Sequence, residues 1–120
     1  MKRPVVWFRF RDLQKREWVV ILTSQKLTKS LRKDKHGGPY HGRAFWSRRI
    51  IYANVFRQTY AEVLDTLIHE LIHIALRGVS LPEELDEAIT SQVATRLALV
   101  FAGCPFGFPE IPEEARSSML

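Results

Sequence analysis

The stretch from Thr59 to Gly78 constrains the fold more than any other part of the sequence. Its apolar residues recur at intervals of three and four, which is the period of a helix with one buried face. Thr59 and Glu62 have the spacing of a capping box, and Gly78 is a typical helix stop. The apolar positions are Val63, Leu64, Leu67, Ile68, Leu71, Ile72 and Ala75. The pattern predicts an amphipathic helix between Thr59 and Gly78.

Two runs of β-favouring residues precede this helix. Val5 to Phe10 and Trp18 to Thr23 are rich in β-branched and aromatic side chains, and residues 12–15 between them suit a turn. The two runs therefore predict a hairpin. Leucines within residues 22–33 also fit the period of a helix, so a helix over that segment stays open as an alternative.

A loop and a third strand are predicted between the hairpin and the helix. Residues 34–43 contain three glycines and one proline, which is the composition of a loop. Residues 48–55 alternate around Ile50, Tyr52 and Val55, which predicts a strand. Because this run also holds two arginines and an asparagine, we expect it at a sheet edge.

A second helix is predicted from Ser80 to Gly103. Ser80 and Glu83 repeat the spacing of a capping box, and apolar residues follow at helical intervals. These residues are Leu85, Ile89, Val93, Leu97 and Phe101. Residues 104–120 are rich in proline and glycine, so we expect them to form an extended C-terminal tail.

Together these elements predict an α+β fold. A small, twisted, mostly antiparallel sheet of about three strands is expected to pack on the two helices. The chain has 120 residues, a length that fits one domain. We expect that domain to span residues 1–103 and the tail to span residues 104–120.

Composition indicates a cytoplasmic protein without a membrane span. Cys104 is the only cysteine, which fits a reducing compartment. Residues 1–11 lack the apolar core of a signal peptide, and the apolar run 93–103 is shorter than a span and contains Arg96. The net charge is +5, with Lys and Arg crowded in residues 2–57. These charges alternate with strand-like residues, as on a solvated sheet face, and only weakly indicate an anionic partner such as nucleic acid.

The first helix carries the string His69-Glu70-Leu71-Ile72-His73. Residues four apart project from one face of a helix, so both imidazoles can bind one ion. Glu70 lies about a hundred degrees around the helix from His69, where it can reach a water bound to that ion. The spacing therefore predicts a zinc site formed by His69 and His73, with Glu70 as general base.

A catalytic zinc ion normally has three protein ligands and one open position. No histidine follows His73, so this chain cannot complete the patterns of metzincins or SprT-like families, which supply a third histidine downstream. The third ligand is therefore expected to be a carboxylate of the second helix. The candidates are Glu83, Glu84, Asp86 and Glu87. Small residues share the face of Glu87 and would allow the two helices to approach closely.

The segment Asp86 to Ser91 resembles the Asn-Glu-Ala-Ile-Ser-Asp signature of thermolysin-type gluzincins. The resemblance implies that Glu87 is the third zinc ligand, with Glu84 as the alternative. It also implies the fold of the minigluzincins, in which a small twisted sheet with an edge strand beside the cleft accompanies two helices. Ser91 stands where the signature has an aspartate that orients a zinc-bound histidine, so that role must come from elsewhere, for example from Asp65.

The implied activity is that of a zinc metallopeptidase in which Glu70 activates water. A peptide substrate could add to the predicted strand 48–55 as a further strand. Relatives use a downstream Tyr or His to stabilise the oxyanion, and neither residue occurs after His73. That role stays unassigned among Tyr52, Tyr60, His36, His41 and Arg96.

Two other functions are kept as alternatives. One is an ImmA/IrrE-like regulatory metalloprotein that acts on a repressor; Glu87-Ala88 fits it, but the Asn/Asp-x-Phe-Ala continuation is missing. The other is a basic nucleic-acid-binding module with a structural zinc ion. A separate hypothesis is that Cys104 or a glutamate of the tail, namely Glu110, Glu113 or Glu114, reaches the zinc and keeps an enzyme latent.

Overall fold

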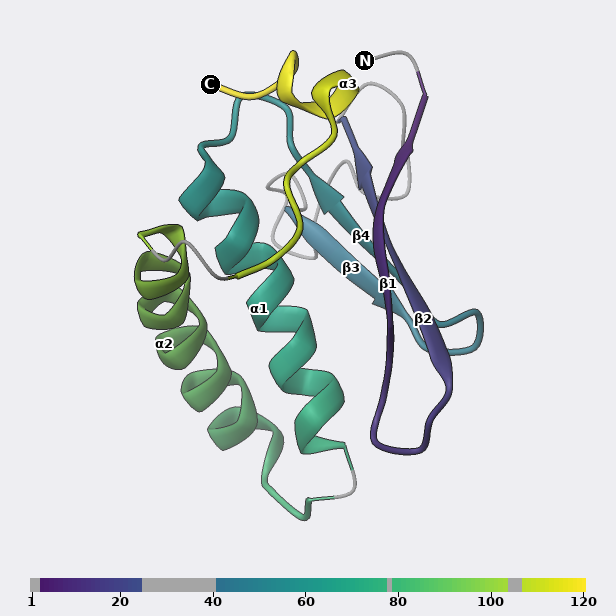
Figure 1. The fold of residues 1–120 in the computed structure, drawn as a ribbon. Coiled ribbons are helices and arrows are strands. Elements are labelled where there is room, and N and C mark those ends of the chain that lie inside the picture. Colours follow the sequence, from purple (N-terminus) through teal and green to yellow (C-terminus); the bar gives the residue numbers. More distant parts are fainter. Residues whose placement is uncertain (1–2, 25–40, 78, 104–106) are drawn as a thin grey trace.

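A computed structural model describes residues 3–24, 41–77, 79–103 and 107–120. The described elements are the strands β1 (Val5–Arg11), β2 (Glu17–Thr23), β3 (Gly42–Phe45) and β4 (Ile50–Asn54) and the helices α1 (Tyr60–Leu76), α2 (Glu83–Ala102) and α3 (Glu113–Arg116). Helix α1 lies between α2 and a four-stranded sheet (Figure 1). The α+β class is therefore as predicted. None of the described helices combines the length and apolar character needed to cross a membrane.

The predicted hairpin is present as β1 and β2, which pair antiparallel. Asp12 organises its turn, since one carboxylate oxygen accepts hydrogen bonds from the backbone N–H groups of Gln14 and Arg16 and the other from the Trp18 indole, all at 2.9 Å. Desolvation opposes ionisation of Asp12, but these hydrogen bonds outweigh it and lower its pKa to about 2. The alternative helix within 22–33 is contradicted by β2 as far as Thr23, and residues 25–33 lie outside the described part.

The third predicted strand exists, but its place in the sheet differs from the prediction. Strand β4 is central, because it pairs parallel with β2 and antiparallel with β3 in the order β1-β2-β4-β3. The arginines Arg48 and Arg49 precede the strand instead of pointing from an edge, while Ile51 and Ala53 are fully buried. The sheet is thus mixed and has one strand more than expected.

Strand β3 forms the sheet edge, in a segment whose first residues were predicted to be a loop. A Cβ atom at Gly42 would collide with Thr66 Cγ2 of α1 and would lie 2.9 Å from the carbonyl oxygen of Tyr52. Glycine therefore allows β3 to approach α1 closely. The same glycine that indicated a loop in the sequence brings the edge strand beside the helix.

Helix α1 follows the prediction closely. Glu62 N–H donates to Thr59 Oγ1 at 3.2 Å and Thr59 N–H donates to Glu62 Oε1 at 3.0 Å, which completes the capping box. The backbone hydrogen bond from Thr59 holds the pKa of Glu62 below its ordinary value of 4.5. The buried residues of α1 are Val63, Leu64, Leu67 and Ile68. The helix ends at Leu76 with Arg77 as its cap, and the predicted stop, Gly78, lies outside the described residues.

Helix α2 packs through a face of small residues, as the sequence suggested for the approach to α1, and only part of its predicted apolar stripe reaches the core. Its buried residues are Thr90, Ala94 and Ala98, whereas Leu85 is 46% exposed. Small side chains let α2 pack closely on α1. Leu97 and Phe101 are half-buried against the core, while Ile89 and Val93 are left on the outer side. The predicted second capping box is also absent, because Pro82 is the N-cap and makes no side-chain hydrogen bond.

The prediction of an extended C-terminal tail is wrong for much of the described part of residues 104–120. Ile111 and Ala115 are buried in the same core as the sheet and α1, and residues Glu113–Arg116 form α3. The Trp7 indole donates to the carbonyl oxygen of Pro109 at 2.7 Å. This hydrogen bond and the packing of Phe108 on Trp7 attach the segment to β1, beside which it runs in Figure 1.

Candidate metal centre

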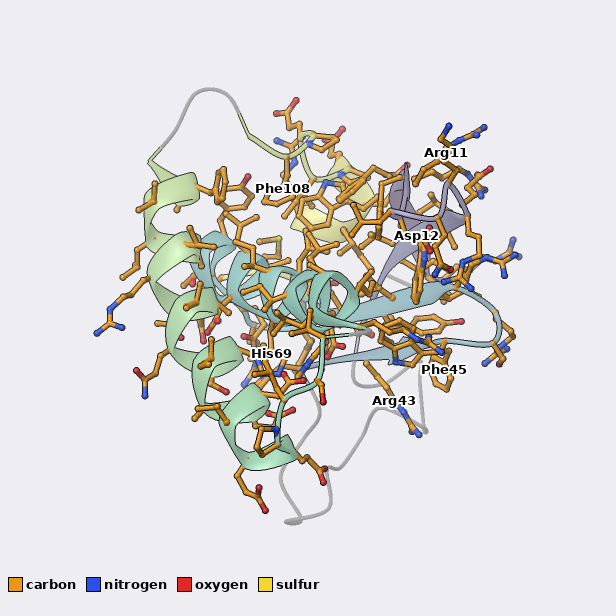
Figure 2. All side chains as sticks on the ribbon, turned by 90° about the horizontal axis from the view of Figure 1, so that it is seen from below. Arg11, Asp12, Arg43, Phe45, His69 and Phe108 are labelled. Carbon is orange, nitrogen blue, oxygen red and sulfur yellow. The ribbon has the colours of Figure 1, made fainter. Side chains whose placement is uncertain are left out.

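Helices α1 and α2 bring His69, His73 and Glu87 together. The Nε2 atoms of the two histidines lie 3.1 Å apart, one helical turn from each other on α1. Glu87 Oε1 lies 2.9 Å from His73 Nε2, and Glu87 Oε2 lies 3.8 Å from His69 Nε2. Figure 2 shows His69 between α1 and the first turns of α2. All three residues therefore direct a ligating atom to one point.

This donor set fits a zinc ion. Ligands about 2.0–2.2 Å from a tetrahedral ion are about 3.3 Å from one another. The two histidine nitrogens are 3.1 Å apart, and one ligating atom from each of the three residues lies within 4.8 Å of the other two. Two imidazoles and one carboxylate are also a known ligand combination of catalytic zinc, with a fourth position left for water.

The electrostatics of His69 also suit metal binding. Burial lowers the pKa of His69, and the charge of His73 lowers it further, although Glu87, Asp65 and Asp86 oppose this. A lowered pKa favours the neutral imidazole, which is the form that binds a metal. The ring therefore presents a lone pair over a wider pH range than an exposed histidine.

Asp86 positions the second histidine. Its Oδ1 lies 3.2 Å from His73 Nδ1 and accepts a hydrogen bond from the hydroxyl of the buried Thr90 at 3.0 Å. A carboxylate on the far nitrogen fixes the orientation of a ligating imidazole. Asp65, which the sequence offered for this role, accepts from Thr95 Oγ1 at 3.4 Å instead. Ser91 is exposed.

Glu70 lines the same cleft as the three ligating residues but does not belong to their cluster. Burial raises the pKa of Glu70 above its ordinary value, and the charge of Glu87 adds to the effect, while His73 opposes it. A half-buried carboxylate with a raised pKa is suited to accept and return a proton.

The cleft has a volume of about 710 Å³ and two differently built walls. The helices contribute Glu70, Asp86, Arg77 and the three ligating residues, and the opposite wall comes from β3 and the residue after it. That second wall consists of Gly42, Arg43, Ala44 and Trp46. Figure 2 shows Arg43 and Phe45 on this strand side.

Of the residues considered for stabilising an oxyanion, none that lies in the described part of the chain lines the cleft. Tyr52 packs edge-to-face on Phe45 with ring centres 5.6 Å apart. Tyr60 borders a different hollow, and Arg96 lies on another surface of α2. His41 is exposed and is not among the cleft residues, and His36 lies outside the described part.

Sequence reasoning missed Asp86 as a positioning residue and Arg43, Trp46 and Arg77 as cleft residues. Arg77 carried a usable signal, because it follows His73 by four residues and so projects from the same helix face. Trp46 and Arg43 carried none, since only the pairing of β3 with β4 brings them to the cleft.

The other proposed carboxylates are not found at the cluster. Glu83 and Glu84 are exposed and do not line the cleft. Glu110 pairs with Arg116 at 3.3 Å, and neither Glu113 nor Glu114 borders the cleft. Cys104 lies outside the described residues. The latency hypothesis therefore gains no support from the described glutamates of the tail.

No protein-family model, no curated protein and no solved structure matches the chain.

Proposed function

We propose that the chain is a zinc-dependent metallopeptidase in which His69, His73 and Glu87 hold the ion and Glu70 is the general base. The observation that carries the proposal is that a His/His/Glu set and a second glutamate outside that set, Glu70, line one open cleft. A structural zinc site would instead be closed by a fourth protein ligand. An accessible three-ligand set with a nearby base fits hydrolysis.

A bound zinc ion would lower the pKa of a coordinated water toward ~7 and polarise the scissile carbonyl. The Glu70 carboxylate takes a proton from the attacking water and delivers it to the leaving amine nitrogen. Asp86 keeps the His73 ring oriented through Nδ1 during this sequence. The charge of Glu87 and partial burial favour the protonated state that Glu70 reaches midway.

The edge strand β3 accounts for a peptide substrate. Gly42 and Ala44 border the cleft, and β3 pairs with β4 on one side only within the described sheet. An extended peptide that pairs with β3 would lie along the cleft with its backbone next to the metal ligands. This role moves from the strand predicted at 48–55, which is central, to β3.

Zinc content and casein cleavage test the proposal. We expect the wild type to contain zinc and cleave casein, Glu70→Ala to keep zinc and lose cleavage, and Glu87→Ala to lose most of both. Glu84→Ala is the matched control, because this exposed glutamate lies on the same helix outside the cluster. A wild type that binds no zinc, or a Glu70→Ala variant that cleaves like the wild type, would contradict the proposal.

A further inference from the structure

Two cationic side chains, Arg43 and Arg77, line the cleft and are not used by the proposed chemistry. Arg43 lies over Phe45 of the edge strand, whereas Arg77 packs on a ring that is anchored in the core. Arg77 lies one helical turn after His73, and its guanidinium carbon is 4.2 Å from the centre of the Trp46 ring. Trp46 in turn contacts the buried Trp18 edge-to-face, with ring centres 5.3 Å apart. The guanidinium is therefore held against an aromatic platform anchored in the core.

Within the described part of the chain, Arg77 forms no ion pair. The arginine ion pairs found there are Arg9 with Glu17, Arg16 with Asp12, and Arg116 with Glu110. The carboxylates of the cleft face the other way: Asp86 and Glu87 contact the histidines. An arginine at a helix C-terminus also interacts favourably with the helix dipole. That interaction explains a positive charge at this position but does not require stacking inside a cleft.

Arg77 and Trp46 also border a second, smaller hollow of about 120 Å³ beside the β1–β2 turn, with Leu13 and Gln14 on its other side. The two residues thus separate this hollow from the metal cleft. Trp46 follows β3 directly in the chain, and both Trp46 and Arg77 line the cleft that holds the candidate metal ligands. An extended ligand that follows β3 past Phe45 would therefore meet the guanidinium.

We propose that Arg77 is a specificity-determining residue that binds a carboxylate of the substrate. This inference rests on the proposed peptidase function. A guanidinium forms two parallel hydrogen bonds with a carboxylate, and stacking on Trp46 reduces the side-chain freedom lost in binding. The carboxylate is either an acidic side chain near the scissile bond or the C-terminal carboxylate of a short peptide.

Matched peptides distinguish these two sources. Cleavage sites are first mapped by mass spectrometry on a mixed peptide library. Pairs that differ by Asp against Asn, or Glu against Gln, at each flanking position are then compared, each with a free and with an amidated C-terminus. In one of these comparisons we expect the peptide with the carboxylate to have a kcat/KM roughly tenfold or more above that of its neutral partner, which is the range of a charge-assisted contact.

Two substitutions of Arg77 and one control locate the cause. Arg77→Gln should collapse the preference, and Arg77→Lys should retain part of it, because the charge stays but the planar fork is lost. Arg57→Gln is the matched control: Arg57 also stacks on an aromatic ring, 5.2 Å from the centre of Phe56, and does not line the cleft. The preference ratio of the control should equal that of the wild type.

Equilibrium binding separates failure of this inference from failure of the peptidase function. The same peptides are titrated against Glu70→Gln, with and without Arg77→Gln, by fluorescence anisotropy. If the wild type cleaves no peptide, the proposed function fails, and the binding ratio alone decides the role of Arg77. The inference is overturned if acidic and neutral peptides bind and react equally in the wild type, or if a preference survives in both Arg77 variants.

Discussion

The two helices that meet at the candidate metal centre are held in place by different means. Helix α1 begins in a complete capping box and buries four large aliphatic residues against the sheet. Helix α2 begins at Pro82 without a side-chain cap and buries Thr90, Ala94 and Ala98. Helix α1 is therefore anchored by large aliphatic side chains, whereas α2 is attached through small buried side chains and the half-buried Leu97 and Phe101.

The ligands of the site are divided between these unequal supports. His69 and His73 come from the helix with large buried side chains, whereas Glu87 and the positioning residue Asp86 come from the helix that is attached mainly through small ones. A metal ion shared by both helices would therefore stabilise the attachment of α2. The contrast shows that a candidate site can draw its ligands from two helices that pack by different means.

The core contact of α1 should give the largest effect. Leu64 is fully buried, so Leu64→Ala is expected to lower the free energy of unfolding by about 2–5 kcal/mol. Leu99→Ala on the outer side of α2, where Leu99 is 65% exposed, should cost about 0.5 kcal/mol or less. Urea denaturation of both variants measures the difference. Equal losses would show that Leu99 contributes as much to stability as the fully buried Leu64.

The positioning of His73 should have the next largest effect. Asp86→Asn weakens the contact with His73 Nδ1 and is expected to reduce zinc affinity about 10–100-fold, as for other groups that orient a ligating histidine. Asp65→Asn is the control, because Asp65 hydrogen-bonds Thr95 and acts on His69 through its charge. Competition with a chromophoric chelator measures both affinities. A larger loss in Asp65→Asn would reverse the assignment.

The two helix starts allow a direct test of capping. Thr59 accepts a hydrogen bond from Glu62 N–H, so Thr59→Ala should cost about 1 kcal/mol. Ser80 has the same sequence spacing to Glu83, but Pro82 is the N-cap of α2. Ser80→Ala should therefore leave the free energy of unfolding nearly unchanged. Thermal unfolding of the Thr59→Ala and Ser80→Ala variants measures the two effects. A loss of stability in Ser80→Ala comparable to that in Thr59→Ala would mean that Ser80 and Glu83 do form a capping box.

The smallest expected effect is a pH dependence at the start of α1. The hydrogen bond from Thr59 holds the pKa of Glu62 below 4.5 in the folded state. The stabilisation that Glu62 contributes is therefore fully present above the pKa that Glu62 has in the unfolded chain. It is lost as the pH falls through the pKa that Glu62 has in the folded protein. The stability difference between wild type and Glu62→Gln should shrink accordingly in acid.

The comparison of the helices also explains what could be predicted from the sequence. The start and the buried face of α1 are determined by local spacing, and both are as predicted. For α2, the small residues on the face of Glu87 indicated the contact with α1, and Ala94 and Ala98 are buried there, whereas the large apolar residues did not, since Ile89 remains 39% exposed. Hydrophobicity alone does not report which face a neighbouring helix can approach.

The strand order of the sheet and part of the site could not be predicted either, because both depend on contacts between segments that are distant in the sequence. That β4 is central and β3 is the edge depends on partners about thirty residues away along the chain, such as Val20 for Ile51. The histidine pair follows from spacing within one helix, but the choice among four carboxylates needed the resemblance, and the structure brings Glu87 to the histidines. Trp46 reaches the cleft only through the fold.

Zinc titration of the metal-free protein tests the central claim most directly. Isothermal titration calorimetry of the wild type should show one zinc ion bound per chain. His73→Ala and Glu87→Ala should each weaken binding strongly, whereas Glu84→Ala should bind like the wild type, because Glu84 lies outside the His69, His73 and Glu87 cluster. A wild type that binds no zinc, or variants of His73 and Glu87 that bind it undiminished, would contradict the account.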